Sequence, residues 1–214
     1  MPTDMIAGTG KIFKNRREAA ELLAAELCRF AGENPLIVGI PRGGVPMARI
    51  IADALKTDVD VILVHKLRSP LNPEYAIGAI DEQGNVMLSE PDAQEQDKYI
   101  RAEIENERQL LEARRQLYTP VRQPVKVRGR AVIIVDDGIA TGWTIKAAIR
   151  SLQKQEAREV IVAAPVGAPD ALREIRKIAD YLVVLNAPVY FHAVGEFFNE
   201  FNQVTDDEVV ACLR

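Results

Sequence analysis

The stretch VIIVDDGIATGWT, residues 132–144, combines an apolar strand, two acids and a loop of mostly small residues. Four branched apolar residues run directly into Asp136 and Asp137. If this strand is parallel to its neighbours, it delivers the two acids to the carboxyl edge of a sheet, where open α/β folds bind their ligands. The stretch therefore predicts both a fold class and the position of a site.

The rest of the chain supports an α/β fold, because short apolar runs alternate with longer periodic segments. Such alternation is typical of parallel strands joined by crossover helices. The apolar runs predict core strands at 36–40, 59–65, 131–137, 159–165 and 181–186. The periodic segments predict helices at 15–30, 45–55, 144–155 and 170–179.

Two segments depart from this alternation. Residues 75–90 have the pattern of a hairpin, with DEQGN as the turn between two short strands. Residues 92–118 have helical periodicity with a single apolar stripe. We expect these segments to form an excursion from the sheet rather than a separate domain.

Composition narrows the class of protein. The 214 residues fit one domain, and 27 basic against 31 acidic residues give no general attraction to nucleic acid or to anionic lipid. Cys28 and Cys212 have neither metal-type nor redox-type spacing, and no apolar run reaches the roughly 18 residues of a membrane span. We expect a cytoplasmic protein with reduced thiols, in which any anion is bound by a local site.

The loop after the two acids suits a phosphate group. The helix that follows offers unpaired N–H groups and a positive dipole end, Gly142 lets the backbone approach closely, and Thr141 and Thr144 add hydroxyl donors. Since carboxylates repel phosphate, Asp136 and Asp137 need another partner, either a sugar diol or Mg²⁺ held directly or through water. A phosphorylated pentose that carries a metal-bound second anion would satisfy all of these groups.

Residues 132–144 resemble the phosphoribosyl-pyrophosphate (PRPP) signature of type I phosphoribosyltransferases, with strand, acid pair, Thr-Gly and Thr in order. The resemblance implies a parallel sheet flanked by helices under a hood, and Mg²⁺-dependent transfer of phosphoribose from PRPP with release of pyrophosphate. Asp136 and Asp137 would then act as catalytic carboxylates at the ribose and as Mg²⁺ ligands. The 5′-phosphate would lie on the loop formed by Gly138, Ile139, Ala140, Thr141, Gly142, Trp143 and Thr144.

Two further segments match the family in order. GIPRGGVPMA (39–48) resembles its pyrophosphate loop, which would bring Arg42, Gly43 and Gly44 to the leaving diphosphate. HKLRSPLNPEYAIGAI (65–80) matches its mobile loop. In that loop the resemblance gives Lys66 catalytic and diphosphate contacts, Arg68 a diphosphate contact, and Glu74 an acid or base role.

The tail beginning FHAVGEFF resembles that of a stand-alone bacterial group of the family whose substrate has not been assigned. The resemblance implies one domain over 1–214, with a core at about 11–68 and 125–186 and a hood at about 69–124 and 187–214. Phe191 and Phe198 are the candidates for facing the base, although aromatics at this spacing also suit core packing. Neither His65 nor His192 receives a catalytic role.

The acceptor is not specified beyond a nucleobase or a small nitrogen compound. Enzymes of the family that act on 6-oxopurines usually carry an aspartate before Thr-Gly, and Ala140 stands there instead, which argues against those bases. Trp143 replaces a smaller residue and is expected to pack outward.

Two other functions remain as alternatives. A PRPP sensor that binds nucleic acid would need a basic surface, and the densest basic segments, 122–130 and 15–20, are short. A sugar-phosphate hydrolase would result if water reached the activated sugar. The sequence also leaves open whether the protein forms a homodimer. The apolar stripe of 92–118 could form the contact surface between subunits, or it could cover the protein's own active site.

Overall fold

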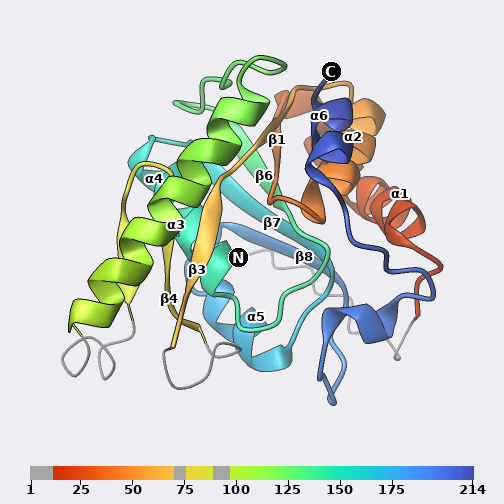
Figure 1. Ribbon diagram of the computed structural model, residues 1–214. Coiled ribbons are helices and arrows are strands. Elements are labelled where there is room, and N and C mark those ends of the chain that lie inside the picture. The colour runs from red at the N-terminus through yellow and green to blue at the C-terminus, as the bar shows by residue number, and fades with distance from the viewer. Residues whose placement is uncertain (1–11, 70–75, 89–96) are drawn as a thin grey trace.

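A computed structural model describes residues 12–69, 76–88 and 97–214 of the chain (Figure 1). Its centre is a five-stranded parallel sheet in the order β2-β1-β6-β7-β8. The strands are β1 (Leu36–Gly39), β2 (Val59–Val61), β6 (Ala131–Val135), β7 (Glu159–Val166) and β8 (Tyr181–Asn186). The predicted α/β class, with a parallel sheet between helices, is confirmed.

Helices cover both faces of this sheet. On one face α1 (Arg16–Leu27) and α2 (Gly44–Leu55) pack against the odd-numbered positions of β6, such as Ile133, and a short 3-10 helix (Cys28–Glu33) follows α1. On the other face α4 (Trp143–Lys154) and α5 (Pro169–Ile175) pack against the even-numbered positions, such as Ile134. Because both faces are covered, the strands are almost continuously apolar.

A second sheet is antiparallel and consists of β3 (Val64–Arg68), β4 (Ala76–Asp81) and β5 (Val86–Leu88). It confirms the predicted hairpin, whose turn is closed by the carboxylate of Asp81, which accepts hydrogen bonds from the amides of Gln83 and Asn85 at 3.1 and 2.8 Å. Helix α3 (Asp97–Tyr118) lies along this sheet (Figure 1).

The prediction of one strand over 59–65 was wrong. The amide of Ile62 still donates to the carbonyl of Gly39 in the parallel sheet, at 3.1 Å, whereas the carbonyl of Leu63 accepts from Glu82 at 3.0 Å. The chain therefore leaves one sheet for the other at this point, and the continuous apolar run conceals the change because both segments are buried. The helix predicted at 170–179 is also shorter, since α5 ends at Ile175.

The C-terminal segment returns across the molecule to the start of α1. After a 3-10 helix (Val194–Phe197), the amide of Phe13 donates to the carbonyl of Phe197 at 2.8 Å, and Asn199 donates to Phe13 at 2.9 Å. The last helix, α6 (Asp206–Leu213), lies against α2 and α3 (Figure 1). Within the described residues, the helices are all too short or too polar to cross a bilayer.

Candidate functional site

The carboxyl edge of the parallel sheet brings two loops together. Strand β6 ends at Val135 and continues into Asp136 and Asp137, while the neighbouring β1 ends at Gly39 and continues into the loop that begins α2. The amide of Ile40 donates to the carbonyl of Val135 at 3.0 Å, which fastens one loop to the other. Both predicted ligand loops therefore lie side by side.

Two glycines allow this close approach. A Cβ at position 43 would lie 1.9 Å from Oδ2 of Asp137, and one at position 44 would lie 2.3 Å from the carbonyl oxygen of Val135. No real Cβ tolerates such contacts, so a side chain at position 44 would force the loops apart, and one at position 43 would displace either the loop or the carboxylate of Asp137. The glycine pair predicted for the diphosphate loop thus also sets the position of an acid.

The loop cavity, as we call it, opens over the segment that follows Asp136 and has a volume of 470 Å³. Gly142, at φ +76°, turns the chain into α4, so the positive end of this helix faces the cavity. Lys66 enters from β3, and His192 and Val194 enter from the C-terminal segment. The lining from the loop itself comprises Asp136, Gly138, Ile139, Ala140, Thr141, Gly142, Thr144 and Ile145.

Beside it lies a second hollow of 410 Å³, here called the arginine cavity. The charged residues that line it are Arg16, Arg42 and Asp137. The backbone of Gly43 and the segment Phe201–Val204 complete most of the lining. Val194 lines both cavities, and the consecutive residues Asp136 and Asp137 contribute one to each. The two cavities therefore meet at the acid pair.

The two acids differ in their partners. The amide of Asp137 donates to Oδ1 of Asp136 at 2.9 Å, while Oδ2 of Asp137 accepts from Nε and Nη2 of Arg16 at 2.9 and 2.7 Å. Burial, followed by the neighbouring charge of Asp137, raises the pKa of Asp136 well above its ordinary value. Burial also raises the pKa of Asp137, but the charge of Arg16 opposes the rise. Asp136 is thus the acid that most needs a cation or a hydroxyl donor.

Arg42 lies on the far side of the arginine cavity and is held by the last helix. Its Nη1 is 3.3 Å from Oδ2 of Asp206, whose other oxygen accepts from the hydroxyl of Tyr118 at 2.5 Å. Burial and the bond to Asp206 raise the pKa of Tyr118. One carboxylate from α6 therefore connects the end of α3 to the predicted diphosphate loop.

Strand alternation separates the side chains of β3. Lys66 points into the loop cavity, whereas His65 faces α3 and lies 2.5 Å from Oε2 of Glu107. Burial lowers the pKa of His65 to about 4, so the ring is neutral at pH 7. Arg68 is exposed at the end of β3 and lines neither cavity. Within the predicted mobile loop at 65–80, residues 70–75, which include Glu74, lie outside the described residues.

The two phenylalanines predicted to face the base, Phe191 and Phe198, are not among the residues that line the loop cavity. Phe198 is buried and packs against Phe13, with ring centroids 5.5 Å apart, and Phe191 stacks on Phe197 at the same distance. Core packing accounts for both positions, and a role for either ring at the base stays a prediction. Trp143 packs against the α4 side of the core, and Lys146 lies 5.1 Å from its ring.

Three polar residues of the site received no role from the sequence. Arg16 and Asp206 lie at helix N-termini far along the chain from the motifs, and His192 lies in an irregular segment. The tail that resembles the family includes both His192 and Asp206, but the resemblance assigned a role to neither of them. Arg16 had no local pattern to identify it.

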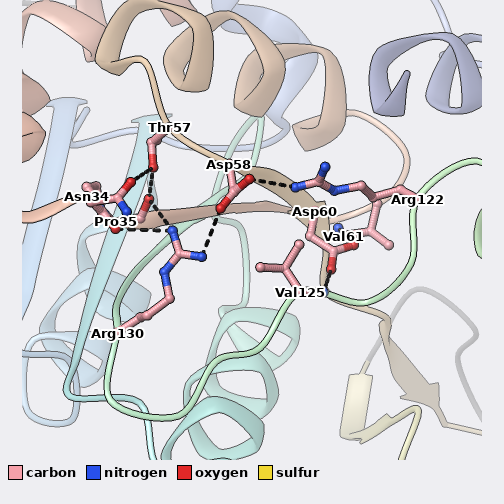
Figure 2. Close-up of polar contacts among 9 residues, drawn as sticks. All are labelled: Asn34, Pro35, Thr57, Asp58, Asp60, Val61, Arg122, Val125 and Arg130. Atoms are coloured by element: carbon pink, nitrogen blue, oxygen red, sulfur yellow. Dashed lines mark hydrogen bonds and ion pairs between the residues drawn. The ribbon is translucent and has the colours of Figure 1, made fainter.

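The basic segment at 122–130 lies at the opposite end of the parallel sheet, where the strands begin. Figure 2 shows Asp58 between two arginines of this segment, with Nη2 of Arg122 at 2.9 Å and Nη1 of Arg130 at 3.0 Å. Hydrogen bonds from Arg130 and Arg122 lower the pKa of Asp58. Nearby, Asp60 accepts from the amide of Val125 at 2.7 Å. These arginines join strand ends within the fold and do not form an unpaired basic patch.

The sequence is similar to those of proteins with a phosphoribosyl transferase domain, in agreement with the two loops and the acid pair of the site. The family model described as phosphoribosyl transferase domain matches residues 3–196. A Mycobacterium tuberculosis protein (strain H37Rv) named "Putative phosphoribosyl transferase" is 38% identical over 210 residues, which cover 95% of this chain and 46% of that protein. The chain thus spans about half the length of the curated relatives it matches.

Solved structures also resemble the chain. The crystal structure of TT1426 from Thermus thermophilus is 38% identical, has a TM-score of 0.82, and covers 94% of this chain and 97% of its own. The AQ2163 protein from Aquifex aeolicus, at 16% identity and a TM-score of 0.52, shares the fold over 84% of this chain and 78% of its own. With its acid pair, its two loops and a family match over most of its length, the chain belongs to the phosphoribosyl transferase domain family.

Proposed function

We propose that this protein transfers the phosphoribosyl group of PRPP to a nitrogen acceptor and releases pyrophosphate. The observation that carries the proposal is the meeting of two anion-suited cavities at Asp136 and Asp137. A 5′-phosphate fits the loop cavity, where a helix N-terminus and the hydroxyls of Thr141 and Thr144 converge. The diphosphate fits the arginine cavity, and the ribose between them would present its hydroxyls to the two acids.

The chemistry required of the protein is mostly positioning and management of charge. Displacement at the anomeric carbon develops positive charge on the sugar and negative charge on the leaving diphosphate. Asp136 and Asp137 would orient the ribose hydroxyls below the cationic ring, and Arg42 would stabilise the departing anion in the arginine cavity. Lys66, which lines the loop cavity, would reach the substrate from that side.

The residues also fit a Mg²⁺ ion that arrives with its substrate. Among the described residues, no group of three or more His, Cys, Asp or Glu side chains could hold a metal. Mg²⁺ typically takes one or two carboxylates together with substrate phosphates, and Asp136 has no cationic partner of its own in the contacts described above. We propose that Asp136, with Asp137, holds the ion directly or through water and ribose, and that Mg²⁺ neutralises the diphosphate.

The acceptor would enter the loop cavity beneath the C-terminal segment. His192, Ala193 and Val194 line this cavity together with Ile139 and Ala140. A flat nitrogen heterocycle suits this mixture of one polar ring and apolar neighbours. Because Ala140 offers no carboxylate, a 6-oxopurine that needs one would lose its partner, so we favour other nucleobases or small nitrogen compounds. In this arrangement, residues 187–214 would form part of the hood over the acceptor site.

The experiment that tests the proposal measures pyrophosphate released from PRPP and Mg²⁺, with and without pooled nucleobases. The native protein is compared with Asp136→Asn, and Asp53→Asn, an exposed residue of α2, is the matched control. We expect release only with a pool that contains the acceptor, a strong loss in Asp136→Asn and no change in Asp53→Asn.

Other outcomes distinguish the alternatives. Release without any acceptor would favour a hydrolase. Binding of PRPP without release from any pool would favour a sensor. If the native protein does not bind PRPP at all, the proposed function is wrong.

A further inference from the structure

Arg16 occupies a place that local helix energetics disfavour. It is the first residue of α1, directly after the N-cap Asn15, where the positive end of the helix dipole repels a cation. Its neighbour Arg17 behaves as a surface residue, with a 3.9 Å ion pair to Glu21 and a side chain that is 74% exposed. The side chain of Arg16, in contrast, is only 15% exposed. A tertiary contact must therefore account for its position.

That contact has three parts, and together they fix the plane of the guanidinium. One edge donates to Oδ2 of Asp137 through Nε and Nη2, at 2.9 and 2.7 Å. Nη1 donates to the carbonyl oxygen of Asn202 at 2.7 Å. The face of the group lies 3.9 Å above the ring of Phe201. The acid is thus tied through Arg16 to the C-terminal segment.

The C-terminal segment presents Phe201 as a platform. The ring of Phe201 stacks on Phe198 with centroids 4.9 Å apart, and Phe198 in turn contacts Phe13 just before α1. Phe201 remains 36% exposed, so burial of its own surface explains little of its position. Its ring supports the guanidinium from below, while the buried Phe198 holds the ring in place.

We infer that Arg16 is a positioning residue for the proposed reaction: it fixes the carboxylate of Asp137, and Phe201 and Asn202 fix Arg16. This inference rests on the proposed function and adds to it a part for the C-terminal segment that is separate from contact with the acceptor. Asp137 is confined between Arg16 on one side and the backbone of Gly43 on the other. The acid is therefore set in place before a substrate arrives, which removes part of the ordering cost of binding.

The test is calorimetric titration of PRPP with Mg²⁺ into the full chain and its variants. Arg16→Gln is expected to weaken binding roughly 10-fold, the low end for loss of a group that orients a ligating side chain. Arg16→Lys should recover part of this loss, since it keeps the charge without the planar pair of donors. Phe201→Leu should weaken binding about 2- to 5-fold, as expected for removal of a cation–π contact. Arg17→Gln is the matched control and should bind as the native protein does.

A double-mutant cycle separates positioning from direct contact. In an Asp137→Asn background, Arg16→Gln should cause no further loss, because Arg16 acts through the carboxylate that has been removed. Native affinity in Arg16→Gln would overturn the inference, and so would an undiminished loss in the Asp137→Asn background, which would mean that Arg16 contacts the ligand itself. The thermal unfolding midpoint of each variant checks that it is folded. Absence of PRPP binding by the native protein would instead overturn the proposed function, and this inference with it.

Discussion

The loop cavity and the arginine cavity meet at one pair of acids, yet they are built in different ways. The loop cavity takes most of its lining from one continuous segment, 136–145, which offers backbone amides, hydroxyls and a helix N-terminus. The arginine cavity takes its charged groups from Arg16, Arg42 and Asp137, which come from three separate parts of the chain, and each arginine contacts a carboxylate. A phosphate site can thus be formed by local backbone geometry, whereas the charged site depends on tertiary packing.

Substitution of Gly43, which contacts Asp137 where the two cavities meet, should lower activity the most. Gly43→Ala would place a Cβ 1.9 Å from Oδ2 of Asp137, so either the loop or the acid must move. A displacement of about 1 Å lowers rates by roughly 100-fold. We expect a loss of that order in pyrophosphate release. Gly32→Ala, where a new Cβ meets no atom within 4 Å, should release pyrophosphate at the native rate. A native rate in Gly43→Ala would show that the close contact has no functional importance.

The division between the cavities should appear as opposite ligand selectivity. Thr141→Val removes a hydroxyl from the loop cavity and should weaken ribose 5-phosphate by about 10-fold, the usual cost of a hydrogen bond to a charged group. Arg42→Gln should weaken pyrophosphate to a similar extent. Each variant should bind the other ligand normally. Equal weakening of both ligands by either variant, measured by calorimetry, would mean that the two cavities are not separate sites.

The acid pair should reduce the stability of the ligand-free protein. Burial and the charge of Asp137 raise the pKa of Asp136, so keeping it ionised at pH 7 opposes folding. Asp136→Asn should therefore be more stable than the native protein at pH 7, which a higher thermal unfolding midpoint would show.

The sign of this effect can be followed with pH. The pKa of Asp136 is higher in the folded than in the unfolded state. Its carboxyl group therefore does not oppose folding below the unfolded-state pKa, near pH 4, where it is protonated in both states. The loss of stability develops as the pH rises from there through the folded-state pKa. The advantage of Asp136→Asn should therefore shrink as the pH falls from 7 toward 4. A variant that is less stable than the native protein at pH 7 would show that the carboxylate is stabilised by its surroundings.

The smallest effect is expected at Trp143, which belongs to the loop by sequence but lines neither cavity. Trp143→Phe keeps an aromatic ring against the core and should leave ribose 5-phosphate affinity within about 2-fold of native, as is usual away from a site's contacts. Calorimetry with the same ligand as for Thr141→Val allows a direct comparison. A loss as large as that of Thr141→Val would place the indole ring at the phosphate.

The same contrast explains what could be predicted from the sequence. The parallel strands, the hairpin and the loops at 39–48 and 132–144 depend on local periodicity and on glycines, so adjacent residues contained enough information. The break between β2 and β3 escaped because Ile62 and Leu63 are both buried and continue the apolar run. In the aromatic tail, the rings at 191 and 198 pack on Phe197 and Phe13, and His192 lines the cavity, an arrangement that the spacing of the aromatics alone did not specify.

Arg16 and Asp206 show the limit most clearly. Their partners lie 121 and 164 residues away, at Asp137 and Arg42, and no local pattern distinguishes Arg16 from Arg17. Arg16 meets its partner where α1 packs beside the loop after β6, and Asp206 meets its partner through α6. Charged pairs of this kind depend on the completed fold, and the structure was needed to find them.

The central claim is that PRPP spans both cavities across the acid pair, and calorimetry of PRPP against its two fragments tests it most directly. Titrations of PRPP, ribose 5-phosphate and pyrophosphate, each with Mg²⁺, would be compared on the native protein. The account predicts that PRPP binds more tightly than either fragment, because it alone reaches both cavities at once. If ribose 5-phosphate or pyrophosphate binds as tightly as PRPP, one of the two cavities contributes nothing and the account is wrong.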